Sequence, residues 1–167
     1  MSKDLLSNGH VVNLLYPVAD AFAGGVDTDV ICLRDYGKIA FIISTGAIED
    51  AGISNLITVK ACTDAAKTGA TAIPFRSRIC LSSTSVDAWS DLAARAAAGY
   101  NFAAAFPVAN AIWYIEVDAE EVSAGLAEAD FVYLTIAETA NKTITASAIA
   151  VLQEPRYPQM TPPTAIA

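Results

Sequence analysis

Few residues in this chain could act in acid–base or nucleophilic catalysis. His10 is the only histidine among 167 residues, and no G-x-S-x-G motif follows it. A hydrolytic triad needs a base beside its nucleophile, so we interpret His10 as a surface or interface residue. Asp118, Glu120 and Glu121 lie on one short turn, where a sugar could not sit between two carboxylates as glycosidases require. The sequence therefore predicts that the protein is not an enzyme.

Metal and cofactor sites are not indicated either. No C-x-x-C pair occurs, and the three cysteines are far apart in the chain, at Cys32, Cys62 and Cys80. A free cysteine in an apolar strand behaves as a small hydrophobic residue, with a disulfide or a reactive thiol as the alternative. Asp27 and Asp29 have the alternate spacing of calcium-loop oxygens but lack the downstream glycine and glutamate of an EF-hand. We therefore expect no metal ion and no cofactor.

Four residues remain as candidates for contact with a partner. Arg76 and Arg78 share one face of the alternating run 71–81, whose apolar residues face the other way. In the tail, Arg156 and Tyr157 lie between two prolines and offer a charge-assisted donor and a large amphipathic ring. We predict that Arg76, Arg78, Arg156 and Tyr157 contact a partner.

Aromatic side chains could serve a different purpose. Trp113 and Tyr114 are adjacent on a predicted strand, so one should point inward and the other outward. Trp89, Tyr100 and Phe102 flank an ambiguous, alanine-rich segment. An exposed set of such rings could stack on sugars, whereas core filling and subunit contact are commoner uses. Sugar binding is therefore the alternative function.

Charge and hydropathy argue against two classes of partner. The net charge is −8, and residues 81–167 carry three Lys/Arg against ten Asp/Glu. Nucleic-acid binding depends on clustered Lys and Arg, so none is expected. No apolar run approaches the roughly 18 residues of a membrane span, and the first residues lack the apolar segment of a secretory signal. We expect a protein that is made in the cytoplasm and contacts no membrane.

Period-two alternation of apolar residues is the main structural signal. It predicts strands at 38–44, 54–62, 71–81, 111–117, 129–137 and 143–152, with weaker candidates at 10–15 and 29–33. Pro74 inside the run 71–81 suggests an edge strand or a bulge. An all-β sandwich or barrel follows. The shared phase of the runs places in its core Ile57, Val59, Phe75, Ile79, Ile115, Val132, Leu134 and Ile136.

Two segments favour helix. Residues 85–98 have apolar side chains at helical spacing and many alanines, with an insertion loop as the alternative. Asp118 followed by Glu121 has the pattern of a capping box, which predicts a short helical turn.

The domain organisation follows from length and proline content. Residues 1–154 are predicted to form a single domain with an N-terminal arm of about residues 1–10. Residues 155–167 form a proline-rich C-terminal arm, because four of the seven prolines fall between Pro155 and Pro163. Proline disfavours helix and fixes an extended backbone. We expect this arm to pack on its own domain or on a neighbouring subunit.

Four stretches carry a resemblance to a known group of proteins. They are Asn13–Val30, Ala72–Arg76, Ile115–Glu121 and Pro155–Pro158. The chain resembles small virion proteins of tailed bacteriophages over most of its length, from about Val11 to the end. Its alanine-rich stretch 92–105 departs from that group.

The resemblance implies an antiparallel, jelly-roll-like β-sandwich with short helical insertions and an extended C-terminal arm. It implies a structural protein of the virion, either a head-decoration (cement) protein or another capsid-associated protein, and it brings no catalytic residues. The implied partners are the major capsid protein and further copies of the chain, with a trimer favoured. The implied location is the capsid surface, after synthesis in the host cytoplasm. The alternative is a carbohydrate-binding or tail-associated module of the virion.

Overall fold

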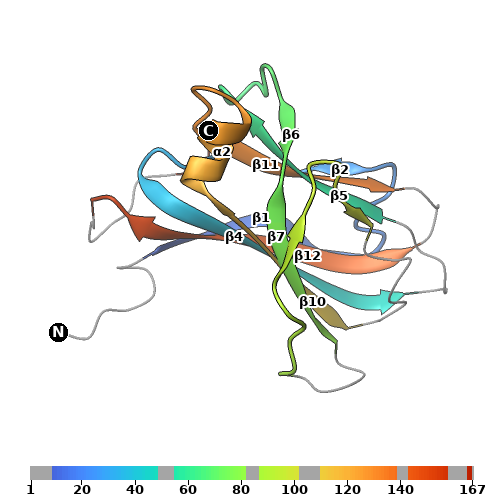
Figure 1. Cartoon of the computed structure of the whole chain (residues 1–167). Coiled ribbons are helices and arrows are strands. Elements are labelled where there is room, and N and C mark those ends of the chain that lie inside the picture. The colour runs from blue at the N-terminus through green and yellow to red at the C-terminus, as the bar shows by residue number, and fades with distance from the viewer. Residues whose placement is uncertain are drawn as a thin grey trace.

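The computed structural model describes residues 9–48, 55–81, 87–101, 110–138, 143–157 and 165–166 (Figure 1). Within them every regular element is a strand except helix α2 (Ala119–Gly125), which follows the tenth strand. The strands are β1 (Gly9–Val18), β2 (Val26–Asp27), β3 (Ile31–Cys32), β4 (Tyr36–Ile48), β5 (Asn55–Cys62), β6 (Thr71–Ile73), β7 (Phe75–Leu81), β8 (Ala93–Arg95), β9 (Tyr100–Asn101), β10 (Ala111–Asp118), β11 (Phe131–Glu138) and β12 (Ile144–Pro155).

The strands form two sheets, and every pair is antiparallel. Sheet A has the order β1-β12-β4-β10-β7-β8. Sheet B has the order β2-β11-β5-β6, with β3 on β11 and β9 on β5. The two longest strands, β4 and β12, run side by side in the middle of sheet A (Figure 1). The predicted all-β class is confirmed.

A large hydrophobic cluster lies between the two sheets. It joins Phe41 and Ile115 of sheet A to Val59 and Leu134 of sheet B, each at most 1% exposed. All eight residues that the alternation placed in the core are buried. The prediction succeeds because a strand sends alternate side chains to opposite faces, so burial of one face fixes the phase of the whole strand.

The register of β5 and β11 shows this alternation directly. Leu134 lies opposite Val59 on the inner face, whereas Tyr133 lies opposite Lys60 on the outer face. The neighbouring tryptophan and tyrosine of β10 divide in the same way: Trp113 is 3% exposed in the core, and Tyr114 lies half-buried on the outer face of sheet A.

Pro74 separates two strands that belong to different sheets. Ile73 ends β6, which pairs with β5 in sheet B, and Phe75 begins β7, which pairs with β10 in sheet A. The single strand predicted over 71–81 was therefore wrong. Proline has no backbone N–H to donate. At the point where the chain leaves one sheet for the other no such donor is needed, so Pro74 is tolerated there without the loss of a hydrogen bond between strands.

The helix predicted over 85–98 was also wrong in its described part, residues 87–98. Ala93–Arg95 form the edge strand β8 on β7. Upstream, Ser90 donates its backbone N–H to the carbonyl of Ile79 and accepts from the Ile79 N–H through its side-chain oxygen. The unpaired edge of β7 thus offers backbone partners, and this pairing overrides the helix propensity of alanine.

The predicted capping box at Asp118 is confirmed. The Glu121 side chain accepts from the Asp118 backbone N–H at 2.9 Å, and the Asp118 side chain caps the helix in return. Val122 is the buried residue of α2, and a Cβ on Gly125 would overlap the side chain of Ile73. The helix is therefore pressed against β6 at one end of the sheets (Figure 1).

Both chain ends are partly described. Gly9 and His10 pair with β12 as the first residues of β1, and residues 1–8 of the expected N-terminal arm lie outside the described residues. In the C-terminal segment, Ala165 is 3% exposed and its carbonyl accepts from the Cys32 N–H at 2.8 Å. Ile166 forms a bridge with β3 of the same chain. Three prolines of the expected arm, Pro158, Pro162 and Pro163, lie outside the described residues.

Candidate functional site

Two of the four predicted contact residues lie together on the outer face of sheet A. Arg78 is paired with Tyr114 across β7 and β10, and Arg76 is paired with Glu116. Trp89 joins them by forming a bridge with Cys80 at the end of β7. We call the surface made by Arg76, Arg78, Trp89, Tyr114 and Glu116 the arginine face.

Arg76 is held by three carboxylates of its own chain. Its Nε donates to Glu116 at 2.9 Å, one terminal nitrogen donates to Asp118 at 2.8 Å, and the other donates to Glu121 at 2.7 Å. Lys38 of β4 adds ion pairs to Glu116 at 3.3 Å and to Asp118 at 3.6 Å. The cluster therefore ties β4, β7, β10 and α2 together.

The charges in this cluster stabilise one another. Hydrogen bonding to Glu116 is the main cause that raises the pKa of Arg76 above its usual range. Burial alone would raise the pKa of Glu116, but hydrogen bonds from Arg76, Tyr114 and Lys38 outweigh it, so the pKa is lowered. Glu116 is thus a carboxylate at neutral pH, and Arg76 has each guanidinium nitrogen occupied within the protein.

Arg78 is held by aromatic rings instead. Its guanidinium carbon lies 5.0 Å from the centre of the Trp89 ring and 4.8 Å from that of Tyr114. The two rings meet edge to face, with centroids 6.4 Å apart. The Nε of Arg78 is buried and has no hydrogen-bond partner among the described residues. Trp89 is 41% exposed, so this group reaches the protein surface.

Tyr114 connects the aromatic and charged parts of the arginine face. Its hydroxyl donates to Glu116 at 2.8 Å. Burial and the nearby Glu116 carboxylate raise the pKa of Tyr114 to about 12, so it remains a neutral donor. This hydrogen bond holds the Tyr114 ring beside the guanidinium of Arg78.

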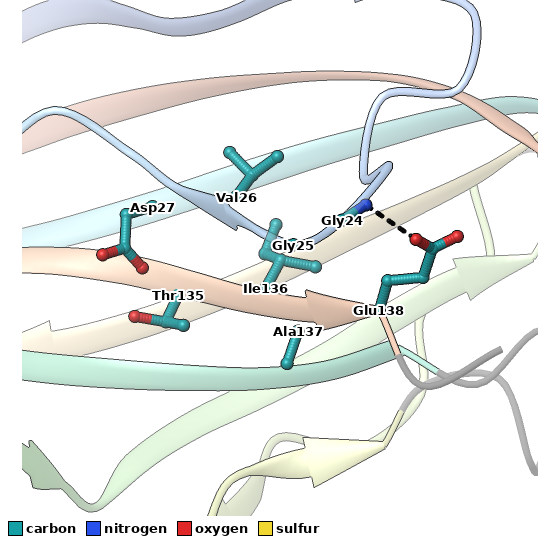
Figure 2. A pocket seen from close by; sticks show the side chains of 8 residues that line it. All are labelled: Gly24, Gly25, Val26, Asp27, Thr135, Ile136, Ala137 and Glu138. Atoms are coloured by element: carbon teal, nitrogen blue, oxygen red, sulfur yellow. Dashed lines mark hydrogen bonds between the residues drawn. The ribbon is translucent and has the colours of Figure 1, made fainter. Parts of the chain in front are cut away.

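A groove of about 490 Å³ lies at the other sheet, where β2 pairs with the end of β11 (Figure 2). At one end Asp27 lies beside Thr135, and at the other Glu138 accepts from the Gly24 N–H at 2.7 Å (Figure 2). Asp27 forms an ion pair with Lys67 at 3.3 Å. Burial alone would raise the pKa of Asp27, but the neighbouring Thr135 hydroxyl and the charge and hydrogen bond of Lys67 lower it.

The groove carries no recognisable metal site. Within the described residues there is no group of three His, Cys, Asp or Glu side chains that could hold a metal ion. Asp27 is engaged by Lys67, which already satisfies its charge. The groove is therefore a hollow in the surface between small residues and two occupied carboxylates.

The other two predicted contact residues lie apart from the arginine face. Arg156 and Tyr157 follow the end of β12, where the Arg156 N–H donates to the Asp35 carbonyl at 2.9 Å. Both side chains are exposed, and Tyr157 is 73% exposed. The structure thus gives Arg76 and Arg78 a shared surface and places Arg156 and Tyr157 on a separate exposed segment.

No feature of the sequence indicated that Trp89 would contact Arg78. The contact arises because residues 89–90 bond to the edge of β7, and no local pattern encodes that pairing. Another missed contact joins Arg95 to Tyr100: the guanidinium carbon lies 3.7 Å from the ring centre, and Nε donates to Ser77 at 2.8 Å. Alternation alone could not show this contact, which joins an edge of sheet A to an edge of sheet B.

All three cysteines are free; Cys62 and Cys80 are buried, and burial is the main cause that raises the pKa of the Cys62 thiol. Across the described parts of the chain, the structure contains no helix with the length and apolar character needed to cross a bilayer.

Comparisons with known proteins give little further information. No protein-family model and no curated protein matches the chain. A similar solved structure is the crystal structure of SPBc2 prophage-derived protein YomS, which is 12% identical in sequence. The alignment covers 86% of this chain and 93% of that chain, with a TM-score of 0.44. At these values the likeness to YomS carries no weight for function.

Proposed function

We propose that the two sheets form a jelly roll. Counting β2 and β3 as one strand, and leaving out β7, β8 and β9 as additions, gives eight strands in chain order. Sheet A then has the order 1-8-3-6 and sheet B the order 2-7-4-5. This is the order of two Greek keys folded face to face, as in jelly-roll domains.

On this basis the protein is a structural component of a virion, a decoration protein that binds and stabilises a bacteriophage head. The strand order is the observation that carries the proposal, because the jelly roll is a common fold of viral capsid domains. The resemblance to small tailed-phage virion proteins supports the same class. The sole histidine of the chain makes one weak hydrogen bond to Tyr36 at 3.4 Å, which fits a structural role for it.

The arginine face is the surface we assign to the contact with the major capsid protein. Trp, Tyr and Arg are the residues most enriched at the hot spots of protein interfaces, where a few side chains contribute most of the binding free energy. Here Trp89, Tyr114 and Arg78 are packed together, and Trp89 is 41% exposed. Arg156 and Tyr157 would form a second, smaller contact, in an oligomer for which we favour a trimer.

The proposal can be tested by decoration of particles. Heads of the phage that carries this gene, prepared without the protein, are mixed with the purified chain and sedimented. We expect saturable co-sedimentation and a higher temperature of head disruption. Saturable binding to tails, with none to heads, would overturn the decoration role.

Trp89 also supports a second candidate, a carbohydrate-binding module of the virion. An exposed indole ring can stack on a sugar face, and Trp89 is 41% exposed. Tyr100, by contrast, is half-buried, and the Arg95 guanidinium carbon lies 3.7 Å from its ring centre. Binding of the purified chain to a glycan array, lost in Trp89→Ala and kept in Tyr100→Phe, would favour this function over decoration.

A further inference from the structure

We propose that Arg78, held between Trp89 and Tyr114, is a binding site for a single carboxylate of a protein partner, an Asp or Glu side chain flanked by apolar residues. This inference rests on the proposed function, since it names the chemistry that the shell would present to the arginine face.

The two arginines of this face differ in what they have available. The guanidinium nitrogens of Arg76 all donate hydrogen bonds within the protein, to Glu116, Asp118 and Glu121. The side chain of Arg78 has no ion pair and no hydrogen bond to the described residues, and its Nε is buried without an acceptor. A donor without a partner costs free energy. Because Nε is buried, a ligand meets the guanidinium at its terminal nitrogens and supplies there an acceptor that the free protein lacks.

The geometry selects a planar acceptor. The guanidinium carbon of Arg78 lies 5.0 Å and 4.8 Å from the centres of the two rings, and the residue is half-buried, so its terminal nitrogens are the N–H groups that a ligand can meet. A carboxylate matches this fork with two parallel hydrogen bonds. Because the rings already limit the movement of Arg78, little side-chain entropy is lost when the ligand binds.

The surrounding charge selects a single carboxylate rather than a polyanion. The cluster around Arg76, on the same face as Arg78, holds three carboxylates, Glu116, Asp118 and Glu121, against two cations, Arg76 and Lys38. The whole chain carries −8. A nucleic acid or an acidic polysaccharide would bring many negative charges close to the carboxylates of a negatively charged protein. A single carboxylate brings only the one negative charge that pairs with the Arg78 guanidinium. The exposed Trp89 then gives apolar neighbours a surface to pack on.

The test uses the intrinsic fluorescence of the full chain. Trp113 is 3% exposed and Trp89 is 41% exposed, so a ligand at this site alters the signal of Trp89. The probe is the capped peptide acetyl-Ala-Leu-Glu-Leu-Ala-amide, and its matched control has Gln in place of Glu. We expect a saturable change with the Glu peptide and about tenfold weaker binding with the Gln peptide.

Protein variants locate the site. Arg78→Gln should weaken binding of the Glu peptide about tenfold, and Arg78→Lys, which keeps the charge without the fork, should weaken it about threefold. Arg34→Gln removes the same charge from an exposed ion pair with Asp130 and should bind as the parent does. Thermal melting is recorded for each variant; if Arg78→Gln does not fold, Arg78→Lys carries the comparison.

Four results would overturn the inference: no saturable change in the parent, equal binding by Arg78→Gln, tighter binding of a uronic-acid oligosaccharide than of the peptide, or a dimer in sedimentation that Arg78→Gln abolishes. The last two identify a glycan or a second copy as the occupant. Co-sedimentation of the parent with heads is scored separately. Heads decorated without peptide binding would leave the proposed function standing and remove only this site.

Discussion

The charged cluster around Arg76 gives the sharpest prediction about stability. Arg76→Gln removes hydrogen bonds of 2.7–2.9 Å to three carboxylates. The Glu116 side chain is 9% exposed, whereas those of Asp118 and Glu121 are about 40% exposed. A charged hydrogen bond is worth about 1.5–3 kcal/mol when shielded from water, and exposed pairs are worth about 0–1 kcal/mol. Glu116 keeps Lys38 and Tyr114, so we expect a loss of about 2 kcal/mol.

The loss should depend on pH. The pKa of Glu116 is lower in the folded protein than its ordinary value of 4.5. Its contribution to stability is therefore complete above about pH 4.5 and is lost as the pH falls through the folded pKa. The difference between the parent and Arg76→Gln should shrink over the same range.

Urea unfolding followed by circular dichroism, at neutral pH and again below pH 4, measures this difference. Arg34→Gln is the matched control, because its ion pair with Asp130 is exposed on both sides and should change stability by less than about 0.5 kcal/mol. If Arg76→Gln were no less stable than Arg34→Gln, or if its deficit grew in acid, the reasoning about this cluster would be refuted.

Three further outcomes are expected. Leu134→Ala should cost about 2–5 kcal/mol in urea unfolding, because Leu134 is 0% exposed between the sheets; parent-like melting would contradict this. Deletion of residues 155–167 should leave the domain folded but lower its melting temperature, because the contacts of Ala165 and Ile166 with β3 are lost. The deletion should also weaken attachment to heads, and unchanged attachment would contradict this prediction. His10→Ala should behave as the parent does in any hydrolase assay. An activity that is present in the parent and lost in this variant would contradict the interpretation of His10 as a residue without a catalytic role.

The sequence was informative where one local rule decides the structure. The phase of Val132, Leu134 and Ile136 follows from alternation, and the capping box at Asp118 follows from four residues. It was uninformative where distant segments compete for the same partner. The alanines near Ala93 favour helix, yet the free edge of β7 binds them as a strand.

The candidate site divides along the same line. That Arg76 and Arg78 share a face could be predicted, since they are two positions apart on a strand. The different surroundings of the two arginines could not be predicted. Glu121, which binds Arg76, comes from α2, and Trp89, which contacts Arg78, comes from the segment 87–92, so both partners come from elsewhere in the chain.

A cryo-electron microscopy map of the phage particle tests the central proposal most directly. We predict copies of the chain on the outer surface of the head at symmetry-related positions, each with Arg78 and Trp89 against the major capsid protein. Density for the chain on the tail alone, or on the head with the arginine face turned to solvent, would contradict this assignment.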